Sequence, residues 1–261
     1  MIEPTGLWVY CVIHNRGILN LETQGIHGTS PVHTVAHGDF AMVVSAEPMK
    51  KYRLARDFLI AHQLVNEKVM QTQPVLPVKF CTMAKNAEQI VEQVLKQKEK
   101  TEEFRKTFAE IDGKNEYGLR ARWKNMDQVF ADLTQENEKV KTAKERALRL
   151  SNSERHVALI DIGHVVKEAL EEKNARTAEL LIRELAPHAV QYKRQNVLGD
   201  MNILNTAFLV DAERQVRFDL AVNTLVERYE SLMQFKYVGP APPFNFVEIV
   251  IHWDGTGNTT G

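Results

Sequence analysis

The stretch GPAPPFNF, residues 239–246, holds three of the nine prolines of this 261-residue chain and decides how its C-terminal part folds. Each proline fixes its own φ near −65° and pushes the preceding residue towards extended geometry. Because proline donates no hydrogen bond to a sheet, the stretch cannot be a central strand. It predicts a stiff connector that is either a structural seam or a docking surface. The candidate partner-contacting residues in it are Pro240, Pro242, Pro243, Phe244 and Phe246.

The connector separates an amphipathic helix from a strand-like segment, residues 246–253. The helix places its apolar residues on one stripe, and these residues are Val222, Leu225, Val226, Tyr229 and Met233. Two further strands are predicted before that helix, over residues 189–197 and 203–210. The connector therefore closes the last domain of the chain, and we favour the structural seam over the docking surface.

The N-terminal part alternates strand and helix patterns. Strands are predicted at residues 7–13, 32–36, 40–45 and 75–81, and helices at 54–73 and 86–110. The turn at His37-Gly38-Asp39 joins the second and third strands as a hairpin. This succession predicts an α+β domain with a helix-covered sheet.

The turn at residues 112–115, Asp-Gly-Lys-Asn, is the predicted domain boundary. After it come an alternating strand at 116–123, a long helix at 126–147, a helix begun by the capping box at Ser151–Glu154, and a third helix that ends before Pro187. We therefore expect two domains, residues 1–113 and 114–254, the second with a helical insertion, and a frayed tail at 255–261.

Composition and charge exclude several classes of protein. Thirty-three basic against 34 acidic residues leave a net charge of −1, which gives no electrostatic case for nucleic acid. No apolar run approaches the ~20 residues that span a bilayer. The N-terminus lacks the pattern of a signal peptide. Cys11 and Cys81 lie in apolar runs, so we expect buried free thiols and a cytoplasmic location.

No motif for catalysis or cofactor binding is visible in the sequence. There is no Gly-x-Ser-x-Gly elbow and no phosphate-binding glycine loop. The loop histidines His27, His33 and His37 are the one candidate metal site, but no cysteine pair or aspartate cluster accompanies them. We therefore predict no catalytic, cofactor-binding or metal residues, and keep a metal- or small-molecule-sensing regulatory protein as the alternative.

A small basic patch lies on the alternating strand at residues 116–123. Arg120, Arg122 and the following Lys124 could contact an acidic partner, and the two arginines complete the candidate partner-binding set. Tyr117 and Trp123 on the same strand are the candidate stacking aromatics for RNA, a third and weaker hypothesis.

Several segments, in order along the chain, resemble the gas vesicle protein L/F family. QPVLPVKF at 73–80, with Cys81 and Thr82, is similar to that family's "vLPvrFGT", and GPAPPFNF to its "GPlPPYsF". GDFAMVVS at 38–45 resembles "gdlaavvS", and AFLV at 207–210 resembles "aaFLV". The family usually has glycine where this chain has Cys81, so we expect a backbone there that does not use positive φ.

The resemblance implies a two-domain α+β protein whose sheets have ferredoxin-like character. It also implies an accessory protein of gas vesicle formation, without catalytic residues or cofactor. The implied partners are the small hydrophobic shell protein and other accessory proteins, met during nucleation or growth of the vesicle. The alternative stays a sensing protein built on paired ferredoxin-like units.

Overall fold

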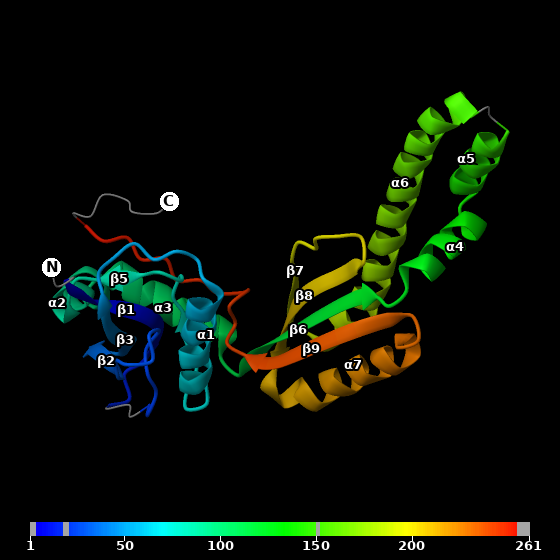
Figure 1. Ribbon diagram of the computed structural model, residues 1–261. Coiled ribbons are helices and arrows are strands. Elements are labelled where there is room, and N and C mark those ends of the chain that lie inside the picture. Colours follow the sequence, from blue (N-terminus) through cyan, green and yellow to red (C-terminus); the bar gives the residue numbers. More distant parts are fainter. Residues whose placement is uncertain (1–3, 18–20, 150–151, 255–261) are drawn as a thin grey trace. The chain divides into compact units, whose positions relative to one another are not determined.

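The computed structural model describes residues 4–17, 21–149 and 152–254 of the chain. These form two compact units (Figure 1): the described parts of Met1–Glu116 and Pro240–Gly261, called unit 1, and those of Tyr117–Gly239, called unit 2. The predicted domains place residues 240–254 with the second half, whereas that segment packs in unit 1. The predicted tail at 255–261 and Ser151 of the capping box lie outside the described residues.

Unit 1 is built on an antiparallel sheet. Its strands are β1 (Thr5–His14), β2 (Val32–His37), β3 (Phe40–Pro48), β4 (Leu76–Pro77) and β5 (Met83–Ala84). Their order is β2-β3-β1-β4, and β5 also pairs with β1. The predicted hairpin is confirmed: β2 pairs antiparallel with β3, and Gly38 adopts φ +57° in the turn between them.

Helices cover both faces of the sheet in unit 1. On one face α1 (Arg56–Met70) packs Val65 and Val69 against β1 residues such as Trp8. On the other face lie α2 (Ala87–Ile90), the π-helical turn η1 (Val91–Leu95) and α3 (Lys98–Ile111). Residues 8–13 of β1 are consequently all buried, which explains the continuous apolar run LWVYCVI.

Four details of unit 1 differ from the sequence-based expectation. The charged helix expected over 86–110 is interrupted at Gln97, where ψ is 116° and the side-chain amide donates to the Glu92 carbonyl. The strand expected over 75–81 is reduced to Leu76–Pro77, followed by an isolated bridge from Val78 to Ile249. Cys81 has φ +68°, so the expected absence of positive φ was wrong. Cys81 is also exposed, whereas Cys11 is buried, and both thiols are free.

Unit 2 repeats the strand order of unit 1, and its fourth strand is much longer than that of unit 1. Its strands are β6 (Lys114–Trp123), β7 (Gln191–Arg194), β8 (Asn202–Asp211) and β9 (Met233–Ala241), in the order β7-β8-β6-β9. In both units the first four strands, taken in chain order, are arranged 2-3-1-4. With the helices between them, unit 2 has the βαββαβ sequence of ferredoxin-like domains.

The helices of unit 2 lie on one face of its sheet. They are α4 (Met126–Glu136), α5 (Glu138–Leu148), α6 (Asn152–Leu185) and α7 (Gln215–Tyr229), with short 3₁₀ turns at Ala186–His188 and Ala212–Arg214. α6 projects well beyond the sheet, with α5 alongside it (Figure 1). A single hydrophobic cluster joins β6 and β8 to α6 and α7.

The boundaries of these elements correct the expected ones in three places. The long helix expected over 126–147 breaks at Asn137, whose side chain caps α5 by accepting from the Lys139 and Val140 amides. The two helices expected before Pro187 are one, α6. The last strand is β9 and not residues 246–253, which form only the bridge at Ile249. β9 is an edge strand, as Pro240 within it requires.

Candidate functional site

The proline-rich stretch divides at residue 240. Pro240 is exposed at the end of β9, whereas Pro242 and Pro243 are buried. Phe244 is half-buried, and Phe246 packs at the margin of the unit 1 core. The structure therefore does not gather the five candidate residues on one exposed surface.

The stretch and the segment after it are held to unit 1 by specific hydrogen bonds. The Asn245 backbone amide and side-chain amide donate to the two carboxylate oxygens of Glu116, at 2.7 and 2.5 Å, and Glu116 is only 6% exposed. Further on, Ile249 exchanges backbone hydrogen bonds with Pro77 and Lys79, and Val247 and Ile249 are buried in the core. We call residues 242–254 the C-terminal strap.

The second candidate set, Arg120 and Arg122, lies on the face of the unit 2 sheet that is opposite the helices. Both side chains are exposed, and each donates to a neutral amide oxygen: Arg120 to Asn205 at 3.2 Å and Arg122 to Gln234 at 2.7 Å. The aromatics of the RNA hypothesis point the other way. Tyr117 is 1% and Trp123 5% exposed, so neither presents a ring for stacking, and that expectation was wrong.

The loop histidines do not converge on one site. His27 Nδ1 lies 2.6 Å from the buried Glu47 carboxylate, which also accepts from Ser45 Oγ at 2.8 Å. His33, on β2, faces its own loop, with Nδ1 3.5 Å from the Pro31 carbonyl. Within the described residues no group of three or more His, Cys, Asp or Glu side chains is arranged to hold a metal ion.

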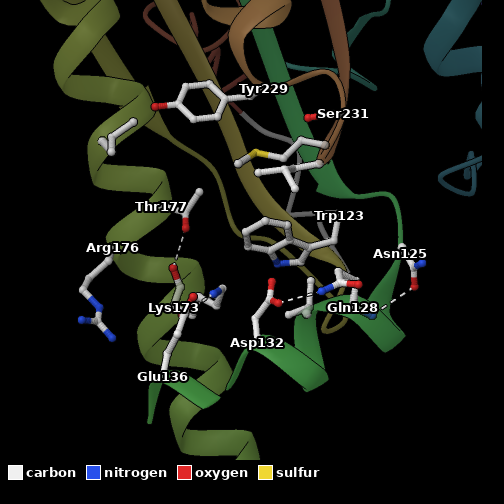
Figure 2. Close-up of a pocket in the computed structure, with 14 residues that line it drawn as sticks. Trp123, Asn125, Gln128, Asp132, Glu136, Lys173, Arg176, Thr177, Tyr229 and Ser231 are labelled. Atoms are coloured by element: carbon white, nitrogen blue, oxygen red, sulfur yellow. Dashed lines mark hydrogen bonds and ion pairs between the residues drawn. The ribbon is translucent and has the colours of Figure 1, made fainter. Parts of the chain in front are cut away.

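A groove of about 470 Å³ in unit 2 is the site that the sequence reasoning missed. Figure 2 shows it between α4, α6, the end of α7 and the start of β9. Its apolar residues are Trp123, Val129, Leu180, Leu232 and Met233, and Tyr229 stands at one end. The signal available in the sequence was Trp123, an aromatic at the strand end where the chain turns into α4.

The floor of the groove is held rigid by Trp123. Its indole Nε1 donates to Asn174 Oδ1 of α6 at 2.7 Å, and Asn174 Nδ2 donates to the Asp200 carbonyl at 3.0 Å. At the N-terminus of α4, Asn125 Oδ1 accepts from the Gln128 amide at 3.2 Å. The first two bonds join β6 to α6 and α6 to the segment before β8, and the third caps α4, so the apolar floor is preformed.

The rim of the groove is polar and internally paired. Lys173 Nζ of α6 lies 2.8 Å from Glu136 Oε2 of α4, and Gln128 Nε2 donates to Asp132 Oδ1 at 2.8 Å. The Thr177 hydroxyl donates to the Lys173 carbonyl at 2.8 Å (Figure 2). An apolar floor with a paired polar rim is suited to binding an apolar group and orienting it.

The most perturbed histidine lies in the core of unit 1. Burial lowers the pKa of His62 to about 4. Its Nδ1 accepts from the indole of Trp8 at 3.0 Å, so the ring is a neutral acceptor within the packed core. Burial also raises the pKa of the Cys11 thiol far above its ordinary value, which leaves that sulfur protonated and unreactive.

Comparison with known proteins gives one consistent result. The family model described as "Gas vesicle synthesis protein GvpL/GvpF" matches residues 6–248. The chain is 25% identical to gas vesicle protein F of Microcystis aeruginosa over 247 residues, which cover 94% of this chain and 99% of that one. It is 24% identical to gas vesicle protein F1 of Halobacterium salinarum, with 94% of each chain covered.

Two crystal structures share the fold. The gas vesicle protein GvpF from Anabaena sp. PCC7120 superposes with a TM-score of 0.78 at 22% identity, covering 94% of this chain and 99% of that chain. GvpF from Microcystis aeruginosa gives a TM-score of 0.70 at 22% identity, covering 92% and 98%. Among the described residues, no helix is both long and apolar enough to cross a membrane.

Proposed function

The chain belongs to the gas vesicle synthesis protein GvpL/GvpF family, and we propose that it is a non-enzymatic accessory factor that binds the hydrophobic shell protein and other accessory proteins while gas vesicles nucleate or grow. The observation that carries this proposal is the match of the family model to nearly the whole chain. We place the protein in the cytoplasm, in association with the vesicles.

The groove of unit 2 supports a binding role. In the groove, Lys173 is paired with Glu136, and the Thr177 hydroxyl donates to a backbone carbonyl rather than to a side-chain base. Its floor offers apolar surface that is already shaped. A shell protein that is hydrophobic must keep its apolar side chains out of water before assembly, and a preformed apolar groove can cover one of them.

Among the sequence-based candidates, we keep Arg120, Arg122 and Pro240 as partner-facing residues, because their side chains are exposed. The burial of Pro242 and Pro243, and the packing of Phe246, favour a structural role for the strap. Phe244 is half-buried, and we assign it the same structural role.

The proposal is tested by co-purification. The full chain, immobilised, is incubated at low ionic strength with the shell protein and, separately, with each sibling accessory protein. We expect retention of the shell protein and of at least one accessory protein. Retention of none of them would overturn the proposal.

A pair of matched variants tests the groove. Leu232→Glu places a carboxylate in the groove at a side chain that is 49% exposed, whereas Leu198→Glu makes the same change at an 85% exposed residue that does not line it. We expect Leu232→Glu to reduce shell-protein retention strongly and Leu198→Glu to leave it unchanged. Equal retention by both variants would exclude the groove as the binding site.

A further inference from the structure

The open face of the unit 2 sheet carries a band of positive charge that the groove does not use. Arg120 and Arg122 are neighbours on one side of β6, about 7 Å apart along the strand. The Lys124 amide donates to the Leu232 carbonyl, and Arg122 bonds to Gln234. This register places Lys236 of β9 beside Arg120.

Three cations, from the neighbouring strands β6 and β9, form what we call the basic face: Arg120, Arg122 and Lys236.

The positive charge of the two arginines is oriented but not neutralised. Elsewhere in the described chain, exposed cations commonly have carboxylate partners, such as Arg194 with Glu179 at 2.6 Å and Arg228 with Glu184 at 2.9 Å. Within the described residues, no carboxylate lies within ion-pair distance of Arg120 or Arg122. Asn205 and Gln234 hold their guanidinium groups through neutral oxygens. An amide partner fixes the geometry of the group and leaves its full charge for a ligand.

We propose that the basic face binds a carboxylate-rich extended segment of a partner protein. Arginine presents a planar set of donors that matches a carboxylate in two parallel hydrogen bonds. The cations lie on the neighbouring strands β6 and β9, where acidic side chains on one side of an extended chain can reach them. The proposal rests on the proposed function in one respect: it names the chemistry by which an accessory-protein partner is recognised.

Nucleic acid fits this face less well than an acidic peptide. Binding that depends on the phosphate backbone can engage about six to ten phosphates, and it weakens steeply as the salt concentration rises. The three cations of the basic face supply fewer contacts than that. Binding of single strands also relies on exposed aromatic side chains between the cations. The tyrosine and tryptophan of β6 are buried towards the helices. The whole chain, with a net charge of −1, adds no long-range attraction for phosphate.

The test uses the full chain and a defined probe, a short fluorescein-labelled peptide of alternating glutamate and threonine, followed by fluorescence anisotropy at low ionic strength. The double variant Arg120→Gln/Arg122→Gln is compared with Lys144→Gln/Arg146→Gln, which removes the same charge from the exposed face of α5. We expect the first variant to weaken peptide binding roughly tenfold and the second by less than about twofold.

Charge reversal sharpens the test. The variant Arg120→Glu/Arg122→Glu is expected to lose its affinity for the glutamate–threonine peptide and to bind the matched lysine–threonine peptide instead. The proposal is overturned if the wild-type chain does not bind the glutamate peptide, if both double variants weaken binding equally, or if a single-stranded oligonucleotide binds more tightly than the peptide. Because the assay contains no vesicle protein, these outcomes leave the co-purification test of the proposed function untouched.

Discussion

The two units arrange their first four strands in the same order and cover them differently. In unit 1, α1 packs on one face of the sheet and α2, η1 and α3 on the other, so Trp8 and Val9, adjacent on β1, enter two separate hydrophobic clusters. In unit 2, the helices occupy one face, and β6 alternates between buried Leu119 and exposed Arg120. The number of covered faces, and not the strand order, decides which sheet keeps exposed charged side chains such as Arg120 on one face.

The largest expected effect comes from truncating a buried side chain of α3, one of the helices that cover the second face of the unit 1 sheet. Phe104 of α3 is fully buried and its ring packs edge-on against Phe40 of β3, with centroids 5.6 Å apart. Phe104→Ala should lower the free energy of unfolding by about 3–5 kcal/mol, through lost burial and the cavity left behind. Urea denaturation followed by circular dichroism measures it. Lys106→Ala, exposed on the same helix, is the control, and a loss below about 1 kcal/mol at Phe104 would show that α3 is not part of the core.

A smaller effect, dependent on pH, is expected on the opposite face of the same sheet. His62 has a folded-state pKa of about 4, below the ordinary 6.5, so the unfolded chain takes up a proton first as pH falls. Stability from this residue is complete above pH 6.5 and is lost as pH falls towards 4. Between pH 7 and 5 the loss is about 2 kcal/mol.

Denaturation at the two pH values measures this loss. His62→Gln offers an acceptor for the Trp8 indole but does not titrate in this range. The variant should therefore show a shallower pH dependence than the wild type. An unchanged slope would mean that other groups control the acid sensitivity of unit 1.

Substitutions in the strap test whether the stability of unit 1 depends on a segment that is distant in sequence. Pro242 and Pro243 are buried where the strap begins, next to the contact of Asn245 with Glu116. Pro242→Ala/Pro243→Ala should cost about 1–2 kcal/mol, because two rigid residues become flexible in the unfolded chain. Partner retention in the co-purification assay should stay unchanged. Retained stability with lost binding would instead make the stretch a docking surface.

Local patterns predicted much of the fold. The alternation in residues 116–123 correctly indicated a strand with one exposed face, and the apolar run at 7–13 indicated a buried strand. The hairpin at Gly38 followed from its turn residues. The resemblance in residues 38–45, 73–82, 207–210 and 239–246 indicated the family, which no composition or periodicity could have done.

The failures have physical causes, and two of the three below lie in tertiary contact. Residues 246–253 have the composition of a strand, yet most of their backbone pairs with no neighbouring strand, and only Ile249 bridges to Val78. Cys81 takes the left-handed conformation because the turn around it requires that geometry. The groove was missed because Trp123, Leu180 and Leu232 are far apart in sequence and meet only after α4 and α6 pack.

The smallest expected effect belongs to the open face and completes the comparison of the two units. Arg120→Gln/Arg122→Gln removes two exposed side chains whose hydrogen bonds go to neutral amides, so the free energy of unfolding should change by about 0.5 kcal/mol or less. The same denaturation experiment that reports on Phe104 measures it. A strongly destabilised variant would mean that this face is packed, as both faces are in unit 1. Near-wild-type stability would mean that unit 2 keeps the two arginines for something other than its own folding.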